Sequence, residues 1–489
     1  MKYHRIIVLV VAVTLLACGG PEERKAQYRA RAQEYLEAGN YPKARVALRN
    51  VLKIDPKDAD AYFLFAQVEE KEKNWRNAVG LYQKLVELVP DHTAALISLA
   101  KYYLDARLIE EVVSTADKVL AKDRRHPQAH ALKIAVVALE GQLSDAMAKA
   151  EALHSQFPTE PDVAVLLATL QGQRQRYRDA EVTLQRALEA HPKDMDLLNN
   201  LNTILAQGKD LAGAERVARR MIETEPILFD HRLRLARFFN AQGAYEKAES
   251  VLREAITLDP NSEERRLALA DFFSARKDYR AAEQALLAAV TQLPHSAKIQ
   301  FGLAELYFKS GQDAKAREQY ASLVKDYKEK PSGLDAKVKL AEIDLVSGKQ
   351  AEAERQVDEV LKKNPRSSDG LVLSGRMALA RRNGKEAVQA FRTVLHDQPE
   401  LATVYFLIGQ AYLLTGENNL AKESFEQAVA LYPGQVDARR SLAALESQSG
   451  RHQQARARLE DLLKQRPDDV MALDMLMMLN LATKNLVEA

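Results

Sequence analysis

Apolar and polar residues alternate with a helical period along most of the chain. Apolar or small side chains recur at helical intervals, as in Phe63, Ala66 and Val68, which is typical of a helix with one buried face. These segments come in pairs. A glycine often separates the two members, where a helix can end in a left-handed turn. A proline usually follows the second member, because proline cannot continue a helix interior. The pattern predicts helical hairpins repeated along the chain.

The prolines give the length of one repeat. Twelve of the sixteen prolines lie on one grid of 34 residues, which a three-residue insertion near residues 326–333 shifts once. Arg124 stands at the single grid point that lacks a proline. A fixed period of this length indicates a repeat architecture. The grid consists of Pro56, Pro90, Pro158, Pro192, Pro226, Pro260, Pro294, Pro331, Pro365, Pro399, Pro433 and Pro467.

Two rows of small residues keep the same period and predict close helix–helix contacts. In the second helix of each unit, one position is alanine except in the third unit, which has Val112. In the first helix, one position is alanine or glycine in eleven of thirteen units, the exceptions being Ile134 and Asn202. Small side chains let two helix backbones approach closely. One hairpin cannot bury its apolar face alone, so we expect neighbouring units to stack.

Together, these rows resemble the tetratricopeptide repeat. Thirteen units cover residues 25–469, and residues 470–489 form the first helix of an incomplete fourteenth unit. The resemblance implies an all-α superhelical solenoid of about thirteen helical hairpins, with a groove lined by the first helices. Units three and four match the pattern least well, because Val112, Arg124 and Ile134 fall within them.

Residues 1–17 have the pattern of a secretory signal peptide. Lys2 and Arg5 precede the eleven uncharged residues 6–16, of which only Thr14 is polar, and small residues follow. Eleven residues are about half of the ~20 that a helix needs to cross a bilayer. We therefore do not expect a permanent transmembrane anchor in this segment.

Cys18 is the only cysteine, and residues 15–18 (LLAC) resemble the lipobox of bacterial lipoproteins. The resemblance implies cleavage before Cys18, lipid attachment to its sulfur, and a lipidated tether over residues 18–24. It places the chain in the cell envelope, and Gly19 in place of an aspartate favours the outer membrane, with the repeats facing the periplasm. The alternative is an ordinary signal peptide with a cysteine there by chance. A lone cysteine also excludes intrachain disulfides, so packing alone must stabilise the fold.

The sequence contains none of the common catalytic or nucleotide-binding motifs. It lacks a glycine-rich phosphate loop, GxSxG, HExxH and CxxC. His126 and His130 are four residues apart, but Pro127 places the first of them before a helix, so we expect no metal site there. Lys and Arg total 70 against 68 Asp and Glu, which leaves no basic field for nucleic acid. We expect a protein that is not an enzyme and uses no cofactor, metal, nucleic acid or small-molecule substrate.

Acidic residues recur near the start of the first helices. We interpret them as helix caps and as charges that complement the helix dipole, rather than as a ligand array. They are Asp60, Asp162, Asp196, Asp230, Glu264, Asp335, Asp369 and Asp437.

Units six to nine offer the best candidate for a partner-binding groove. Asn199, Asn200, Arg234 and Arg237 are donors that suit a carboxylate or an extended peptide backbone. Aromatic residues recur nearby, and we expect most of them in the core, with one of each pair free to reach the groove. They are Phe238, Phe239, Phe272, Phe273, Tyr307 and Phe308.

The carboxylate clamp with which some tetratricopeptide domains hold chaperone tails is incomplete. Asn200 and Arg234 match two of its five positions, but Val165, Thr169 and Asp230 occupy the other three. We therefore do not expect chaperone-tail binding.

The lipobox followed by these repeats resembles the tetratricopeptide lipoproteins of exosortase and exopolysaccharide loci, most closely over residues 44–79. That resemblance implies a non-enzymatic, membrane-tethered scaffold that binds protein or peptide partners and supports polysaccharide export or surface-protein sorting. One alternative is a pilotin-like assembly factor for pili or secretins. Another is the regulatory array of a larger enzyme such as a glycosyltransferase.

The last helical segment is unusually apolar. It contains Met471, Leu473, Met475, Leu476, Met477, Met478, Leu479 and Leu481. A terminal repeat normally has a polar outer face. We expect the natural chain to continue past Ala489, another chain to cover this face, or the helix to fold back.

Overall fold

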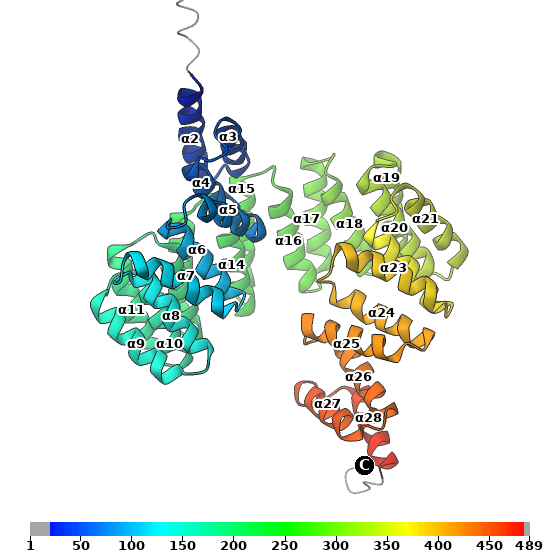
Figure 1. Cartoon of the computed structure of the whole chain (residues 1–489). Coiled ribbons are helices and arrows are strands. Elements are labelled where there is room, and N and C mark those ends of the chain that lie inside the picture. The colour runs from blue at the N-terminus through cyan, green and yellow to red at the C-terminus, as the bar shows by residue number, and fades with distance from the viewer. Residues whose placement is uncertain (1–19, 484–489) are drawn as a thin grey trace, which may run out of the picture. The chain divides into compact units, whose positions relative to one another are not determined.

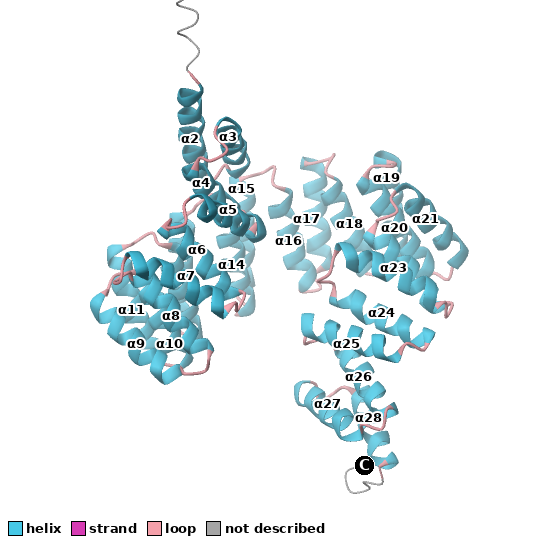
Figure 2. Ribbon diagram, viewed as in Figure 1, coloured by secondary structure: helices cyan, strands magenta, loops and turns pink. Residues whose placement is uncertain are grey.

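The computed structural model describes residues 20–483 (Figure 1). The predicted signal peptide and Cys18 lie outside the described residues, as do residues 484–489. Within the described part, the chain forms 27 α-helices and no strand (Figure 2). The prediction of an all-α solenoid of about thirteen hairpins and a partial fourteenth is confirmed.

The chain divides into two compact units, Met1–Val251 and Leu252–Ala489, and helix α15 (Tyr245–Leu258) runs through the boundary. The other helices of the first unit are α2 (Pro21–Glu37), α3 (Tyr41–Ile54), α4 (Ala59–Lys71), α5 (Trp75–Leu88), α6 (Thr93–Asp105), α7 (Ile109–Lys122), α8 (Pro127–Leu139), α9 (Leu143–Gln156), α10 (Pro161–Gln173), α11 (Tyr177–Ala190), α12 (Met195–Gln207), α13 (Leu211–Thr224) and α14 (Phe229–Ala241).

The helices of the second unit are α16 (Glu263–Ala275), α17 (Tyr279–Gln292), α18 (Ala297–Lys309), α19 (Asp313–Tyr327), α20 (Pro331–Val346), α21 (Gln350–Lys363), α22 (Ser368–Ala380), α23 (Gly384–Asp397), α24 (Ala402–Thr415), α25 (Asn418–Leu431), α26 (Val436–Gln448), α27 (His452–Gln465) and α28 (Val470–Ala482). The first helix, α2, begins at Pro21, four residues before the predicted start of the repeats.

The even-numbered helices are the first helices of their hairpins and form a layer of their own within each unit. In the first unit, α8 contacts α6 and α10 in addition to its partner α9. In the second unit, α16 contacts α18, and α20 contacts α22. The odd-numbered helices form the other layer. Each unit therefore presents one surface made only by first helices.

The alanine row lies at the centre of the packing between helices. All twelve alanines of the row are fully buried. Val112, which takes the place of alanine in the third repeat, is buried to the same extent. On the facing first helices, a Cβ added at Gly375 or Gly409 would lie 2.5 Å from the ring of Phe391 or Phe425, respectively. These close approaches explain why the first-helix row is restricted to small residues.

Each hairpin turns at a residue in the left-handed region, as predicted. Seven of these positions are glycine, with φ between 68° and 86°. At the same position, the other six repeats have Lys73, Arg107, Gln175, Lys209, Lys277 and Arg382, with φ near 60°. The turn geometry is therefore common to all thirteen repeats, although only seven of them have glycine at this position.

The three-residue insertion lengthens the two helices on either side of it. Helices α19 and α20 have 15 and 16 residues, whereas most first and second helices have 13 and 14. Between them, Lys328 adopts a φ of 50°. The first turn of α20 lies so close to Lys328 that a Cβ on Gly333 would be 2.2 Å from the carbonyl oxygen of Lys328. Only glycine fits this position without a backbone shift.

Three repeats bury a carboxylate at a position where six others have an aromatic residue. The position lies three residues after the small residue of the first helix, and it holds Glu69, Asp344 and Glu446, each at most 3% exposed. An arginine pairs with each carboxylate: Arg45 with Glu69, Arg317 with Asp344, and Arg458 with Glu446. At this position, six other repeats have Tyr35, Tyr103, Phe239, Phe273, Tyr307 and Tyr412.

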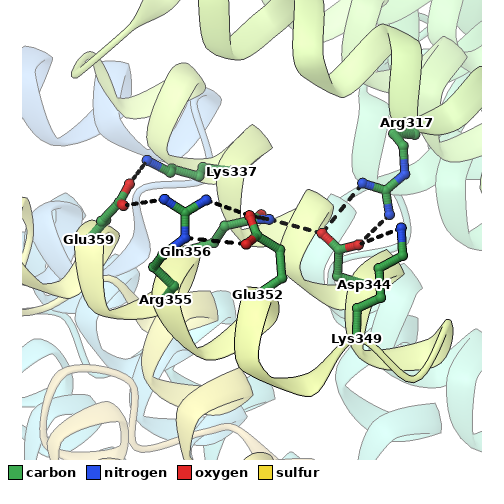
Figure 3. Close-up of polar contacts among 8 residues, drawn as sticks. All are labelled: Arg317, Lys337, Asp344, Lys349, Glu352, Arg355, Gln356 and Glu359. Carbon is green, nitrogen blue, oxygen red and sulfur yellow. Dashed lines mark hydrogen bonds and ion pairs between the residues drawn. The ribbon is translucent and has the colours of Figure 1, made fainter.

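Asp344 lies at one end of an extended polar network (Figure 3). It accepts hydrogen bonds from Arg317 and, at 2.9 Å, from the Nε2 of Gln356, and Lys349 lies 3.9 Å away. Gln356 also donates to Glu352, which pairs with Arg355 on the surface. This network links α19, α20 and α21.

The proposed capping role of the recurrent acidic residues is wrong. Where a side chain caps a first helix that carries one of these acids, it belongs to an earlier residue: Asp58 accepts from the amide of Ala61, and Asp194 from that of Leu197. Asp60 and Asp196 lie one position inside the helix, within the first turn. A carboxylate there still complements the helix dipole, but it is not the hydrogen-bonded cap.

The apolar face predicted at the end of the chain is present on α28. Met471, Met477 and Met478 are 64%, 41% and 59% exposed, whereas Leu479 packs into the core. Within residues 20–483, no helix is long and apolar enough to span a membrane.

Candidate partner-binding groove

The predicted groove residues lie on two first helices of the first unit. Asn199 and Asn200 are on α12, and Arg234 and Arg237 are on α14. The guanidinium of Arg234 donates to the side-chain oxygen of Asn199 at 2.8 Å. The amide of Asn200 donates to a carbonyl of its own helix, and Arg237 is exposed. The structure therefore joins Asn199 and Arg234 directly, while Asn200 and Arg237 lie separately on the same layer.

Residues far apart in the sequence meet at this point within the first unit. Asp230 accepts from Arg234 at 3.2 Å and from Lys73 at 2.8 Å. Beside this pair, Lys71 lies 3.2 Å from Glu225. The hydrogen bond from Lys73 holds the pKa of Asp230 below its ordinary value. These contacts bring the α4–α5 turn against the start of α14, so that part of the first unit closes on itself.

A cavity of about 450 Å³ opens on the first-helix layer of the same unit. It is formed by α6, α8, α10 and α12 and includes Asn200. Val165 and Thr169, which interrupt the chaperone clamp, also line it. Half of its remaining lining residues are apolar and four are charged; they are Lys101, Leu104, Asp105, Gln128, Ala131, Leu132, Ala135, Asp162, Leu166 and Asp196.

The cavity contains more acceptors than the sequence predicted. Lys101 pairs with Asp162 at 2.7 Å, which leaves Asp105 and Asp196 without that cation. Burial raises the pKa of both Asp105 and Asp196. Both residues remain exposed, so their carboxylates can accept hydrogen bonds from backbone amides or a basic side chain of a partner. Their location near the ends of first helices was visible in the sequence, but their convergence depends on how the helices stack.

The first-helix layer of the second unit is hollowed as well. A cavity of about 520 Å³ is lined by residues of α16, α18, α20 and α22, together with Leu286 of α17. Its charged residues include Asp271, Lys298, Glu305, Asp335 and Lys339. Burial raises the pKa of Asp335. Both units thus present alternating charges beside apolar side chains, on the layer where the sequence predicted a groove.

One member of each aromatic pair is buried in the core, and the other is half-buried. Phe239, Phe273 and Tyr307 are buried, while Phe238 and Phe272 are only partly so. His126 precedes α8, as the following proline predicted. No cluster of metal-ligating side chains occurs among the described residues.

Sequence profiles of the tetratricopeptide repeat match residues 29–96, 70–134, 138–203, 239–290, 273–330, 370–434 and 416–477. One of these profiles alone covers more than half of the chain. The chain belongs to the tetratricopeptide repeat family. Solenoids of this family generally act as scaffolds for protein–protein interaction rather than as catalysts.

No curated protein sequence matches the chain. Solved structures with similar chains include the following two. The APC/C hetero-tetramer Cut9–Hcn1 matches with 16% identity over 96% of this chain and 98% of the other, with a TM-score of 0.42. Naa15/Naa10 bound to HypK-THB matches with 12% identity over 95% of this chain and 92% of the other, with a TM-score of 0.47.

Proposed function

We propose that this tetratricopeptide repeat protein is a lipid-anchored scaffold in the periplasm, which binds extended segments of protein partners on its first-helix layer. The observation that carries the binding site is the cavity bearing Lys101, Asp105, Asp196 and Asn200 among apolar side chains. An extended peptide offers amides and carbonyls along its whole length, so alternating donors and acceptors suit it. The resemblance to exopolysaccharide-locus lipoproteins supports a role in polysaccharide export or surface-protein sorting.

The location rests on residues 1–18. A short apolar segment after Lys2 and Arg5 directs export, and Cys18 ends the lipobox. Several acyl chains together give stable anchoring, because each buried CH₂ contributes about 0.8 kcal/mol. The outer membrane is the proposed site because Gly19 follows the cysteine.

Replacing Cys18 with serine should abolish lipid attachment. The wild-type chain is expected to incorporate labelled fatty acid, begin at Cys18 and partition into detergent. The Cys18→Ser variant should show no label, because serine lacks the acylated sulfur. Radiolabelling in growing cells measures this. Labelling that persists in the variant would exclude the lipobox.

Removing both groove arginines should weaken partner capture without unfolding the protein. Arg234 is about half exposed in its pair with Asp230, and such pairs contribute at most about 1 kcal/mol. We expect Arg234→Ala combined with Arg237→Ala to reduce the partners retained from envelope extracts at least several-fold, with an unchanged melting temperature.

A matched control is available on the second-helix layer. Arg178→Ala combined with Arg186→Ala removes the same charge from exposed positions of α11. This variant should retain the partners. Equal loss of capture in both double variants would show that net charge, and not the groove, governs binding.

A further inference from the structure

We propose that the first unit contains a second site, which binds an anionic amphiphile: a carboxylate or phosphate carried on an alkyl or aryl body. The site is a cavity of about 570 Å³ between α7, α8 and α9. This volume lies within the range of about 300–1,000 Å³ that is typical of small-molecule sites. The proposal depends on neither the groove nor the lipid at Cys18.

This cavity lies on a different face of α8 from the groove. The groove cavity uses Gln128, Ala131, Leu132 and Ala135 of α8, whereas the second cavity uses residues 130, 133, 134 and 137. Residues three and four apart share one face of a helix, so these two sets mark two faces. Side chains of the second helices α7 and α9 also line the second cavity, whereas neither helix lines the groove cavity.

The inner part of this cavity is apolar. Ile134 and Leu153 are 8% and 7% exposed, and Leu120, Val137 and Phe157 are half-buried. These five side chains come from all three helices and from the end of α9. A hydrocarbon body placed against them would be removed from water, which contributes roughly 25 cal/mol for each Å² buried.

The cavity's titratable side chains are all basic ones. Arg124, Arg125, His130, Lys133 and Lys149 line it, and no carboxylate does. Lys133 and Lys149 already pair with Asp117 and Asp145 outside the lining.

Arg124 and Arg125 provide the charge available to a ligand. Both are exposed, and neither guanidinium pairs with a carboxylate within residues 20–483. The ring of His130 contacts the carbonyl oxygen of Arg124 at 2.9 Å, which fixes the turn that carries both arginines. Guanidinium groups bind carboxylates and phosphates through paired hydrogen bonds. A ligand with an anionic group and an apolar body could bind the two arginines with its anionic group and pack its apolar body against the apolar side chains of the cavity.

Departures from the repeat pattern converge on this cavity. Arg124 stands at the one grid point without proline, and Ile134 replaces the usual alanine or glycine of the first-helix row. Both residues line the cavity. At the other twelve grid points, proline offers no charge. The two repeats that match the pattern least well therefore contribute Arg124 and Ile134 to this cavity.

The test uses decyl phosphate below its micelle concentration, titrated into the full chain carrying Cys18→Ser. We expect one molecule to bind per chain, while inorganic phosphate and decanol bind at least tenfold more weakly. Arg124→Gln combined with Arg125→Gln should weaken binding of decyl phosphate at least tenfold. Lys57→Gln combined with Lys193→Gln removes the same charge at positions equivalent to 125 in other units and should leave binding unchanged.

A second variant separates the cavity from surface charge. Ala152 is exposed and lines the cavity, so Ala152→Phe should fill it and abolish binding with an unchanged melting temperature. Equal binding of inorganic phosphate, or full binding by Ala152→Phe, would overturn the proposal. Vesicles containing phosphatidylglycerol distinguish the source of the ligand: binding to vesicles without binding to the monomer would show a membrane surface site instead.

Discussion

Replacing Gly333 with alanine is expected to destabilise the second unit by about 3 kcal/mol. The added Cβ would lie 2.2 Å from the carbonyl oxygen of Lys328 and 2.8 Å from its amide nitrogen. Both are backbone atoms, so the α19–α20 turn must move as a whole, and overpacking of this kind costs about 1–3 kcal/mol or more. The midpoint of urea unfolding measures the effect.

Gly80 provides the matched control. It lies inside α5, and a Cβ there would meet no atom within 4 Å. Gly80→Ala should leave stability unchanged or raise it by up to about 1 kcal/mol, because alanine favours the helix. If both substitutions have the same small effect, the turn around Gly333 is not as tight as described.

Removing Arg317 should have the second large effect. Arg317→Ala would leave the carboxylate of Asp344, which is 1% exposed, without its closest cation. Breaking a buried pair in this way typically costs about 3–5 kcal/mol. We expect about 2–3 kcal/mol here, because Gln356 still donates to Asp344. Arg355→Ala, which removes a 64% exposed partner from the same network, should cost less than about 1 kcal/mol. Equal losses would show that the Arg317–Asp344 pair contributes no more than an exposed pair.

The pH dependence of stability should identify Asp344 as the affected group. Burial raises the pKa of Asp344, but hydrogen bonds from Arg317 and Gln356 outweigh it, so the pKa lies below its ordinary value. A lowered pKa in the folded state stabilises the protein above the unfolded value of about 3.9. This stabilisation is lost as the pH falls through the folded value. In Arg317→Ala, the pKa of Asp344 should rise towards or above the unfolded value, so less stability should be lost on acidification than in the wild type.

The repeat architecture could be read from the sequence because its causes are local. Proline at a helix end, glycine at a left-handed turn and alanine at a helix contact each leave a mark at a fixed spacing. The burial of the entire alanine row follows from that spacing. The capping residues were misassigned because Asp58 and Asp60 both lie near the start of α4, and only the helix boundary distinguishes them.

The polar features were harder to predict because they join different units. Nothing in the sequence near Asp230 indicates that Lys73 contacts it, since the contact depends on how successive hairpins rotate. The acids of the groove cavity converge for the same reason. A signal for the buried carboxylates did exist: Asp344 replaces an aromatic at a regular position, and a charge at a core position requires a buried partner.

The central claim, that the first-helix layer binds a protein partner, can be tested by photocrosslinking in intact cells. A crosslinking amino acid is placed at Thr169 or Asn200, which line the groove cavity, and at Val182 on α11, which is 60% exposed on the other layer. We expect Thr169 and Asn200 to crosslink to the same protein, and Val182 to form no such crosslink. Crosslinks that form from Val182 alone would contradict the claim.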